Sequence, residues 1–567
     1  MAQELFLSPS VSPQPLIHRW YAWPQLVSPL TGGLNLRNRQ LAIMDSYLAN
    51  AKIHADALAN PARMAGPFLD PGQSTIDDVK VYGERVRLDA APMLRFAEDV
   101  IAARALLREH ADGGPLTSIY DSLPEGLRGL VELTYDDFDQ PAIRFFESLV
   151  YRDDAYQRNA QSISLLAEPD LNQPFIFNSP LLPNSDRVDI AIPFDSPELD
   201  ALYAARHTAT DVDALADRLG VATGDRARFA ALFTPDAPQP APAPPTDGVR
   251  MRYLGHAGVL LESPDACVLL DPIAGYDGDG IDHVRITDLP PYIDAIVLSH
   301  AHADHVSIET LLQLRHKVGT VIVPGAGGGT VLDPALAPML RALGFANVVS
   351  LGELDSHRAG EGLSVTSVPF LGEHADLDIR AKMVPLVELN GRRFLFATDT
   401  VVIEPKLYHR MGDLVTDVDA LFIGLECVGA PMSWLYGALL GRRPDRAHDR
   451  TRRLSGSDAA MAEVLTTLTR AKHVYTYAMG FEPWLRHMTG SSYEDDSEQV
   501  TQVRELERSL ASQDVPCEML YLRGDRQWLS SATASPPSSR TSFGGCAAST
   551  TGTVRSPWPP TGWSSSV

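Results

Sequence analysis

The segment His300-Ala-His302-Ala-Asp304-His305 directly follows a short apolar run at residues 295–298. Such a run is typical of a buried β-strand, which would end at the polar segment. Three imidazoles and a carboxylate within six residues are costly to remove from water without a partner, and a metal ion suits them. The spacing allows two groups of ligands, with His300 and His302 toward one ion. Asp304 and His305 would then face a second ion.

Strands predicted on both sides of this segment place further polar residues at strand ends. Upstream, the glycine-bracketed turn Gly255-His-Ala-Gly258 separates two strands, and a third strand at 266–270 ends on Asp271. Downstream, strands alternate with helices as far as 393–398, which runs into Asp399. A meander followed by alternating strands and helices predicts two sheets packed face to face, with helices outside. We therefore expect an α/β sandwich.

The composition limits the classes of protein to which this chain can belong. Its 567 residues, 44% of them hydrophobic, suffice for at least two domains. A formal net charge of −24 argues against general nucleic-acid binding. We expect no transmembrane helix, because no apolar run reaches the length of about 18 residues that a span requires. The start of the chain does not resemble a secretory signal, and four widely spaced cysteines without a CxxC pair favour a reducing cytoplasm.

Changes in composition divide the chain into four parts. Alternating proline and alanine at 236–248 cannot continue a helix and predict a linker. Residues 1–235 before it mix predicted helices and strands. We interpret them as an α+β accessory domain for dimerisation, substrate gating or partner docking. Residues 249–529 form the predicted catalytic domain, and 530–567, rich in Ser, Thr and Pro, form a predicted disordered tail.

The motifs of the catalytic domain resemble the metallo-β-lactamase superfamily over roughly residues 250–525. The resemblance implies an αββα sandwich in which Asp399 bridges two metal ions and Asp271 supports the ligands from behind. A partner of that kind, which orients ligand imidazoles, is physically expected.

One position departs from the superfamily's zinc hydrolases, which carry a further histidine ligand before the bridging aspartate. Here that place reads Glu373-His374. If His374 is the ligand, the site is an ordinary zinc site. If Glu373 is the ligand, the carboxylate-rich set favours iron or manganese and suits di-iron oxygen chemistry. Zinc cannot activate O₂, because it has no redox chemistry.

The last ligand has no clear candidate in the predicted late strand at 473–480. The superfamily usually has a histidine after this strand, where Tyr477 stands here, and His473 lies at the opposite end. We take His487 as the ligand, with a structural role as the alternative. His256 is interpreted as a turn residue or a support for a ligand.

With Glu373 in place, the chain resembles a narrower family, the di-iron β-hydroxylases of nonribosomal peptide biosynthesis (the CmlA type of the chloramphenicol pathway). Residues 371–376 and 477–484 carry this resemblance, together with the N-terminal accessory domain. It implies that Glu373 and Asp399 are catalytic as well as ligands. It assigns one iron to His300, His302, Glu373 and Asp399, and the other to Asp304, His305, Asp399 and His487.

The function that this resemblance implies is an O₂-dependent monooxygenase of antibiotic biosynthesis. It would β-hydroxylate an aromatic amino acid that is held as a thioester on a carrier domain of a nonribosomal peptide synthetase. Two iron ions and an external electron donor would be required, and a homodimer is one expected assembly. The alternative is a dinuclear zinc hydrolase of the thioesterase or lactonase type.

Six arginines fall between Arg442 and Arg453, which is unusual in an acidic chain. One interpretation is a solvated surface loop with local Arg–Asp pairs. The other is a docking site for an acidic carrier protein or for the phosphate of its arm, because arginine suits phosphate.

Overall fold

The structure is a computed structural model that describes residues 4–60, 63, 66–110, 112–278, 280–325, 328–490 and 493–530. The described residues belong to one compact unit that extends to Ser530. The predicted tail beyond Ser530 lies outside the described residues.

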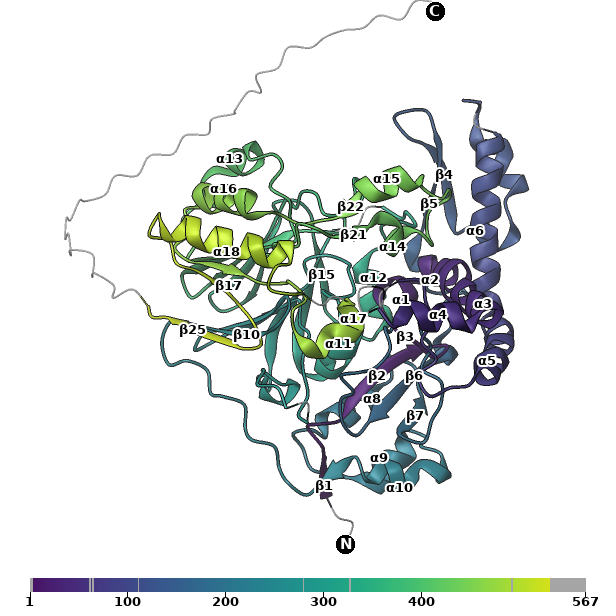
Figure 1. Cartoon of the computed structure of the whole chain (residues 1–567), viewed down its shortest axis with the longest axis horizontal. Helices are drawn as coiled ribbons and strands as arrows, with labels where there is room; N and C mark the ends of the chain where they lie inside the picture. The colour runs from purple at the N-terminus through teal and green to yellow at the C-terminus, as the bar shows by residue number, and fades with distance from the viewer. Residues whose placement is uncertain are drawn as a thin grey trace, which may run out of the picture. The chain divides into compact units, whose positions relative to one another are not determined.

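Two seven-stranded sheets form the C-terminal half of this unit (Figure 1). The first has the order β15-β14-β13-β12-β11-β10-β25 and comprises β10 (Val249–Gly255), β11 (Gly258–Glu262), β12 (Cys267–Leu270), β13 (Ile293–Val297), β14 (Val318–Pro324), β15 (Val348–Leu351) and β25 (Gly524–Trp528). The second has the order β16-β17-β18-β19-β20-β23-β24 and comprises β16 (Ser356–Gly360), β17 (Leu363–Val368), β18 (Val384–Leu389), β19 (Arg392–Thr398), β20 (Ala420–Ile423), β23 (Val474–Thr476) and β24 (Cys517–Met519).

The sheets pack face to face because their central strands are apolar on both sides. Val268 and Phe394 belong to one buried cluster between the sheets, whereas Leu269 belongs to a second cluster and Leu395 to a third. Successive side chains of a strand point to opposite faces, so this alternation buries both faces of each sheet. Helices cover the outer faces, α11 (Ile308–Leu314) and α12 (Leu336–Ala342) on the first sheet, and α13 (Lys406–Met411), α16 (Ala459–Thr469) and α18 (Glu498–Ala511) on the second. The predicted αββα sandwich is confirmed.

The N-terminal half is a mixed α+β arrangement, as predicted. A four-stranded sheet has the order β3-β2-β6-β7 and comprises β2 (Ser12–Ile17), β3 (Trp20–Tyr21), β6 (Gln161–Leu166) and β7 (Arg187–Ala191). The longest described helix, α6, spans Ala91–Glu109. A π-helix at Leu36–Gln40 joins α2 (Pro29–Asn35) to α3 (Leu41–Ala49). Among the described helices, none is both long and apolar enough to cross a membrane.

Arg315 fastens the N-terminal half to the catalytic sandwich. Its buried guanidinium donates to Asp200 (2.9 Å) and to the carbonyl of Ser196 (2.7 Å), and also to the carbonyls of Phe194 and Leu343. One side chain therefore satisfies buried acceptors from both halves of the chain.

We expect Arg315→Met to lower the free energy of unfolding by about 3–5 kcal/mol, because it leaves the buried carbonyls of Phe194 and Leu343 without this donor and breaks the ion pair with Asp200. Arg158→Met is the matched control. Its pair with Asp195 is largely exposed, so the loss should be at most about 1 kcal/mol. Urea unfolding followed by circular dichroism measures both, and equal losses in the two variants would contradict this assignment.

A second contact between the halves predicts a pH dependence of stability. The hydroxyls of Tyr21 (3.1 Å) and Tyr276 (2.5 Å) both donate to Glu309, and burial raises the pKa of this carboxyl to about 7. A carboxyl group whose pKa is raised by folding stabilises the folded state fully at pH values below the pKa that the group has in the unfolded chain. This stabilisation is lost as pH rises toward the folded value. We expect the unfolding free energy to fall by about 1–3 kcal/mol between about pH 4.5 and 7 through this group. Glu309→Gln should flatten that slope in urea titrations, and an unchanged slope would refute the assignment.

Candidate metal centre

The predicted histidine cluster lies in the loop that joins β13 to α11. His300, His302 and His305 are all buried there. The side chain of Ser307 caps α11 by accepting the Thr310 N–H (3.2 Å), which ends the loop. The chain thus holds three imidazoles at the carboxyl end of a buried strand, as the sequence predicted.

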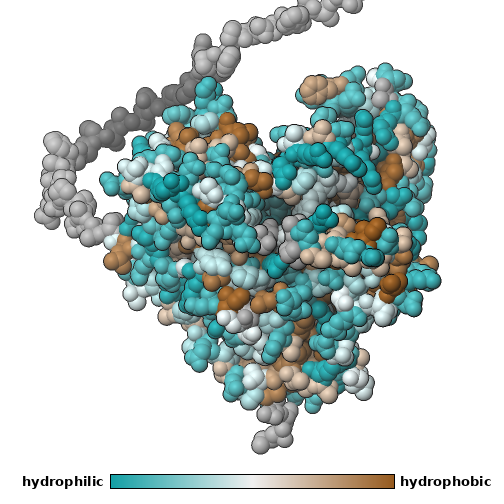
Figure 2. Space-filling view, viewed as in Figure 1, coloured by the Kyte–Doolittle hydropathy of each residue, from teal (hydrophilic) through white to brown (hydrophobic). Residues whose placement is uncertain are grey.

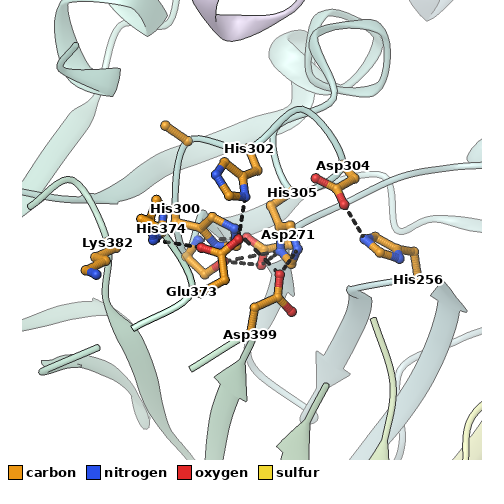
Figure 3. Close-up of polar contacts among 12 residues, drawn as sticks. His256, Asp271, His300, His302, Asp304, His305, Glu373, His374, Lys382 and Asp399 are labelled. Atoms are coloured by element: carbon orange, nitrogen blue, oxygen red, sulfur yellow. Dashed lines mark hydrogen bonds and ion pairs between the residues drawn. The ribbon is translucent and has the colours of Figure 1, made fainter. Parts of the chain in front are cut away.

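Glu373 joins His300 and His302 in the first group of potential ligands, whose donor atoms lie within 4.8 Å of one another. Its Oε1 is 2.9 Å from Nδ1 of His302 (Figure 3). Gly372 and Glu373 have φ values of +80° and +68°, a left-handed backbone conformation that residues other than glycine rarely adopt. Lys382 donates from Nζ to the Gly372 carbonyl (3.0 Å) and so stabilises the turn that directs the carboxylate inward.

His374 does not belong to any of the three groups of potential ligands found in the described chain. Its Nδ1 lies 2.7 Å from Oε2 of Glu373, and its ring packs 4.7 Å from the ring of His302. Burial lowers the pKa of His374 despite the adjacent carboxylate. Of the two alternatives left open by the sequence, the structure places the carboxylate of Glu373 in the cluster, with the ring of His374 behind it.

The carboxylate of Asp399 lies between His300 and His305 at the centre of the cluster. Asp399 directly follows β19, and its Oδ2 is 3.1 Å from Nε2 of His305 and 3.7 Å from Nε2 of His300. These three residues form the second group. Burial lowers the pKa of His300 well below its ordinary value. Burial acts in the same direction on His305, but Asp399 and Asp271 overcome it and raise that pKa well above the ordinary value.

Asp271 supports the cluster from behind, as the resemblance implied. Its Oδ2 accepts hydrogen bonds from Nδ1 of His305 (2.8 Å) and from the hydroxyl of Ser299 (2.5 Å). Its Oδ1 accepts the Ser299 backbone N–H (2.7 Å). This carboxylate therefore turns Nε2 of His305 toward Asp399.

His256 completes the third group, with Asp304 and His305. Its Nε2 is 3.2 Å from Oδ2 of Asp304, and the Gly480 N–H donates to its Nδ1 (3.1 Å). Asp304 packs against these rings and stays partly exposed, and although desolvation alone would raise its pKa, His256 and His305 hold that pKa far below the ordinary range. The sequence interpretation had kept His256 outside the ligand set.

The structure does not bring His487, the predicted last ligand, to this cluster. His487 lies on α17 (Arg486–Thr489), beyond a tight turn at Pro483–Leu485. Its carbonyl accepts the Ile176 N–H (3.1 Å), and its side chain lines a separate small cavity together with Gln14. The turn carries the histidine past the strand end toward the N-terminal half, and the place beside Asp304 is taken by His256.

The residues present fit a pair of metal ions. In the described chain, Nε2 of His300 and Oδ1 of Asp399 are buried without a hydrogen-bond partner, and Nε2 of His256 and of His305 each face only a carboxylate of the cluster. Leaving such atoms unsatisfied is costly, and an ion that accepts their lone pairs removes the cost. The donors are imidazoles and carboxylates without a thiolate, a set that suits iron.

A cavity of about 410 Å³ opens beside the cluster, and Figure 2 shows a hollow in the surface. Trp23, Arg39 and Phe177 from the N-terminal half line it together with Trp434, against whose ring the Arg39 guanidinium packs. No local motif marks these N-terminal residues, so their function does not follow from the sequence alone.

Glu426 also lines the cavity, although it was not among the site residues predicted from the sequence. Burial raises the pKa of its carboxyl to about 8, and the hydroxyl of Tyr493 donates to it. Its position three residues past the end of β20 was a signal that the sequence did contain, because Asp271 and Asp399 also stand just past strand ends.

Two family models match this chain. The model described as the diiron non-heme beta-hydroxylase N-terminal domain matches residues 6–238, and that of the beta-lactamase superfamily domain matches residues 267–434. A metal-dependent hydrolase of Brucella ovis is 32% identical over 179 residues, which cover 31% of this chain and 66% of the hydrolase. The likeness to this hydrolase is thus confined to part of the chain.

A sequence comparison and a structure comparison each match nearly the whole chain. The 4-amino-L-phenylalanyl-CmlP-peptidyl-carrier-protein 3-hydroxylase of Streptomyces venezuelae is 34% identical over 531 residues, covering 91% of this chain and 98% of the relative. The crystal structure of CmlA, a diiron beta-hydroxylase from Streptomyces venezuelae, matches with a TM-score of 0.85 and 32% identity, covering 93% of this chain and 100% of that chain. The resemblance stated from the sequence is confirmed. The chain belongs to the family of diiron non-heme β-hydroxylases.

Proposed function

We propose that this enzyme β-hydroxylates an aromatic amino acid held as a thioester on a carrier domain of a nonribosomal peptide synthetase. The observation that carries the proposal is the position of Glu373, whose carboxylate stands in the buried cluster where zinc hydrolases of this fold have a histidine. The cavity beside it, lined by Trp23, Phe177 and Trp434, suits an aromatic side chain. A relative that acts on a carrier-bound 4-amino-L-phenylalanyl group supports the same substrate class.

The proposed ligand set follows the three groups of potential ligands. One iron is assigned to His300, His302, Glu373 and Asp399, and the other to His256, Asp304, His305 and the shared Asp399. Glu373 and Asp399 are the proposed catalytic residues, because they belong to the groups that would hold the metal ions and also line the cavity.

When bound, the two irons supply the redox chemistry that O₂ activation needs. Overall, a C–H bond and O₂ take up two electrons and two protons and give C–OH and water, so an external electron donor is part of the proposal. The protein's own part is positional. Asp271 orients His305, and the hydroxyl of Ser299 lies 3.0 Å from Nδ1 of His300. Trp23 and Phe177 exclude water from one side of the cavity.

The predicted division at 236–248 into an accessory domain (1–235) and a catalytic domain (249–529) is part of the same proposal. No helix or strand begins between Thr234 and Val249, which is consistent with a linker. A homodimer and a cytoplasmic location stay predictions, and light scattering of the purified enzyme tests the first.

The test uses the iron-loaded enzyme with a reductant, air and the CmlP peptidyl carrier protein loaded with 4-amino-L-phenylalanyl, phenylalanyl or tyrosyl groups. We expect mass spectrometry of the carrier to show the gain of one oxygen atom, derived from labelled ¹⁸O₂. Release of the free amino acid by a zinc-loaded enzyme, without oxygen gain, would establish the hydrolase alternative instead.

A further inference from the structure

A group of unpaired arginines lies close to the site cavity. Arg442, Arg443, Arg446 and Arg450, here called the arginine patch, are all exposed. Within the described part of the chain, none of the four makes an ion pair or a side-chain hydrogen bond. Four free cations within nine residues stand out on a chain of net charge −24. These four arginines lie on a solvated surface, as one interpretation of the sequence expected, but without the local Arg–Asp pairs that it included.

The acidic residues of the same segment have structural tasks instead. Asp445 caps α15 (Arg446–Thr451) by accepting the Ala447 N–H (2.7 Å). Asp449 accepts hydrogen bonds from the backbone N–H (2.8 Å) and the hydroxyl (2.6 Å) of Ser433 on α14 (Met432–Tyr436). These contacts fasten α15 to its neighbour, and neither carboxylate pairs with an arginine of the patch.

The segment that carries the patch also forms part of the cavity wall. The chain leaves α15 into β22 (Arg453–Leu454), which pairs with β21 (Ala430–Pro431). Ala430, Arg453 and Leu454 line the cavity that Glu373 and Asp399 also line. Figure 2 shows hydrophilic surface at the edge of the hollow.

We propose that the arginine patch is the docking surface for an acidic face of the carrier domain. This inference rests on the proposed function. A substrate tethered to a carrier must enter the cavity while its carrier stays outside, so the carrier contacts the surface around the opening. Exposed guanidinium groups without partners attract carboxylates and accelerate encounter, and the overall negative charge elsewhere disfavours the same partner.

The test compares two triple variants of the full-length enzyme with equal changes in charge. Arg442→Glu/Arg446→Glu/Arg450→Glu reverses the patch. Arg85→Glu/Arg410→Glu/Arg508→Glu reverses three exposed arginines that do not line the site cavity. Fluorescence anisotropy measures the Kd of each for the labelled CmlP carrier protein, with and without its phosphopantetheine arm and at two salt concentrations.

We expect the patch variant to bind about tenfold more weakly or worse, with a flatter salt dependence, and the control variant to bind like the wild type. Iron content and thermal midpoint should be the same in both variants. Equal Kd values for the patch variant and the wild type would overturn the proposal, as would an effect that disappears with the armless carrier. Hydroxylation by the wild type is measured in parallel, so failure of the docking surface is distinguished from failure of the proposed function.

Discussion

Asp399→Ala is expected to abolish hydroxylation and to reduce iron from two ions per chain to one or fewer. The carboxylate lies between His300 and His305, within 3.1 to 3.7 Å of their Nε2 atoms, so both ions lose a ligand. We expect kcat to fall by about 10³-fold or more, because both ions and their spacing are affected. Metal analysis and single-turnover hydroxylation measure the two effects.

Asp378→Ala is the control for this substitution. Asp378 is exposed, pairs only with Arg380 in the described chain, and lies near Glu373 in the sequence without joining the cluster. It should keep both irons and wild-type turnover. An Asp399→Ala enzyme that retained two irons and its activity would show that the bridge lies elsewhere.

His256→Ala and His487→Ala are expected to separate the two candidates for the last ligand. His256 shares a group with Asp304 and His305, so its removal should lower the iron content from two ions toward one and turnover by about 100-fold or more. His487 lies outside every such group in the described residues, and burial lowers its pKa to about 4. His487→Ala should therefore keep both irons and lose only stability, by about 1–2 kcal/mol.

Iron quantification and the visible spectrum of each variant check this prediction. The reverse result, with the iron lost in His487→Ala and retained in His256→Ala, would restore the ligand expected from the sequence. It would also assign His256 a purely supporting role at the turn between β10 and β11.

Much of the site follows from local sequence. A buried strand with polar residues at its end is defined within about ten residues of chain, so the segment from His300 to His305, Asp271 and Asp399 could all be placed at one edge of the sandwich. The replacement of a histidine by Glu373 was also visible in the sequence. These residues indicated the fold, the paired metals and their redox chemistry.

The tertiary structure decided which distant residues meet. His256 reaches Asp304 across 48 positions, and the turn at Pro483–Leu485 carries His487 away from the strand end. Trp23 and Arg39 line the cavity although no motif distinguishes them. Such contacts depend on how separate elements pack, whereas strands and turns depend on neighbouring side chains. The sequence by itself therefore determined the chemistry of this protein, whereas packing of the β10–β11 turn against the histidine loop brought His256 to Asp304, and packing between the two halves shaped the cavity.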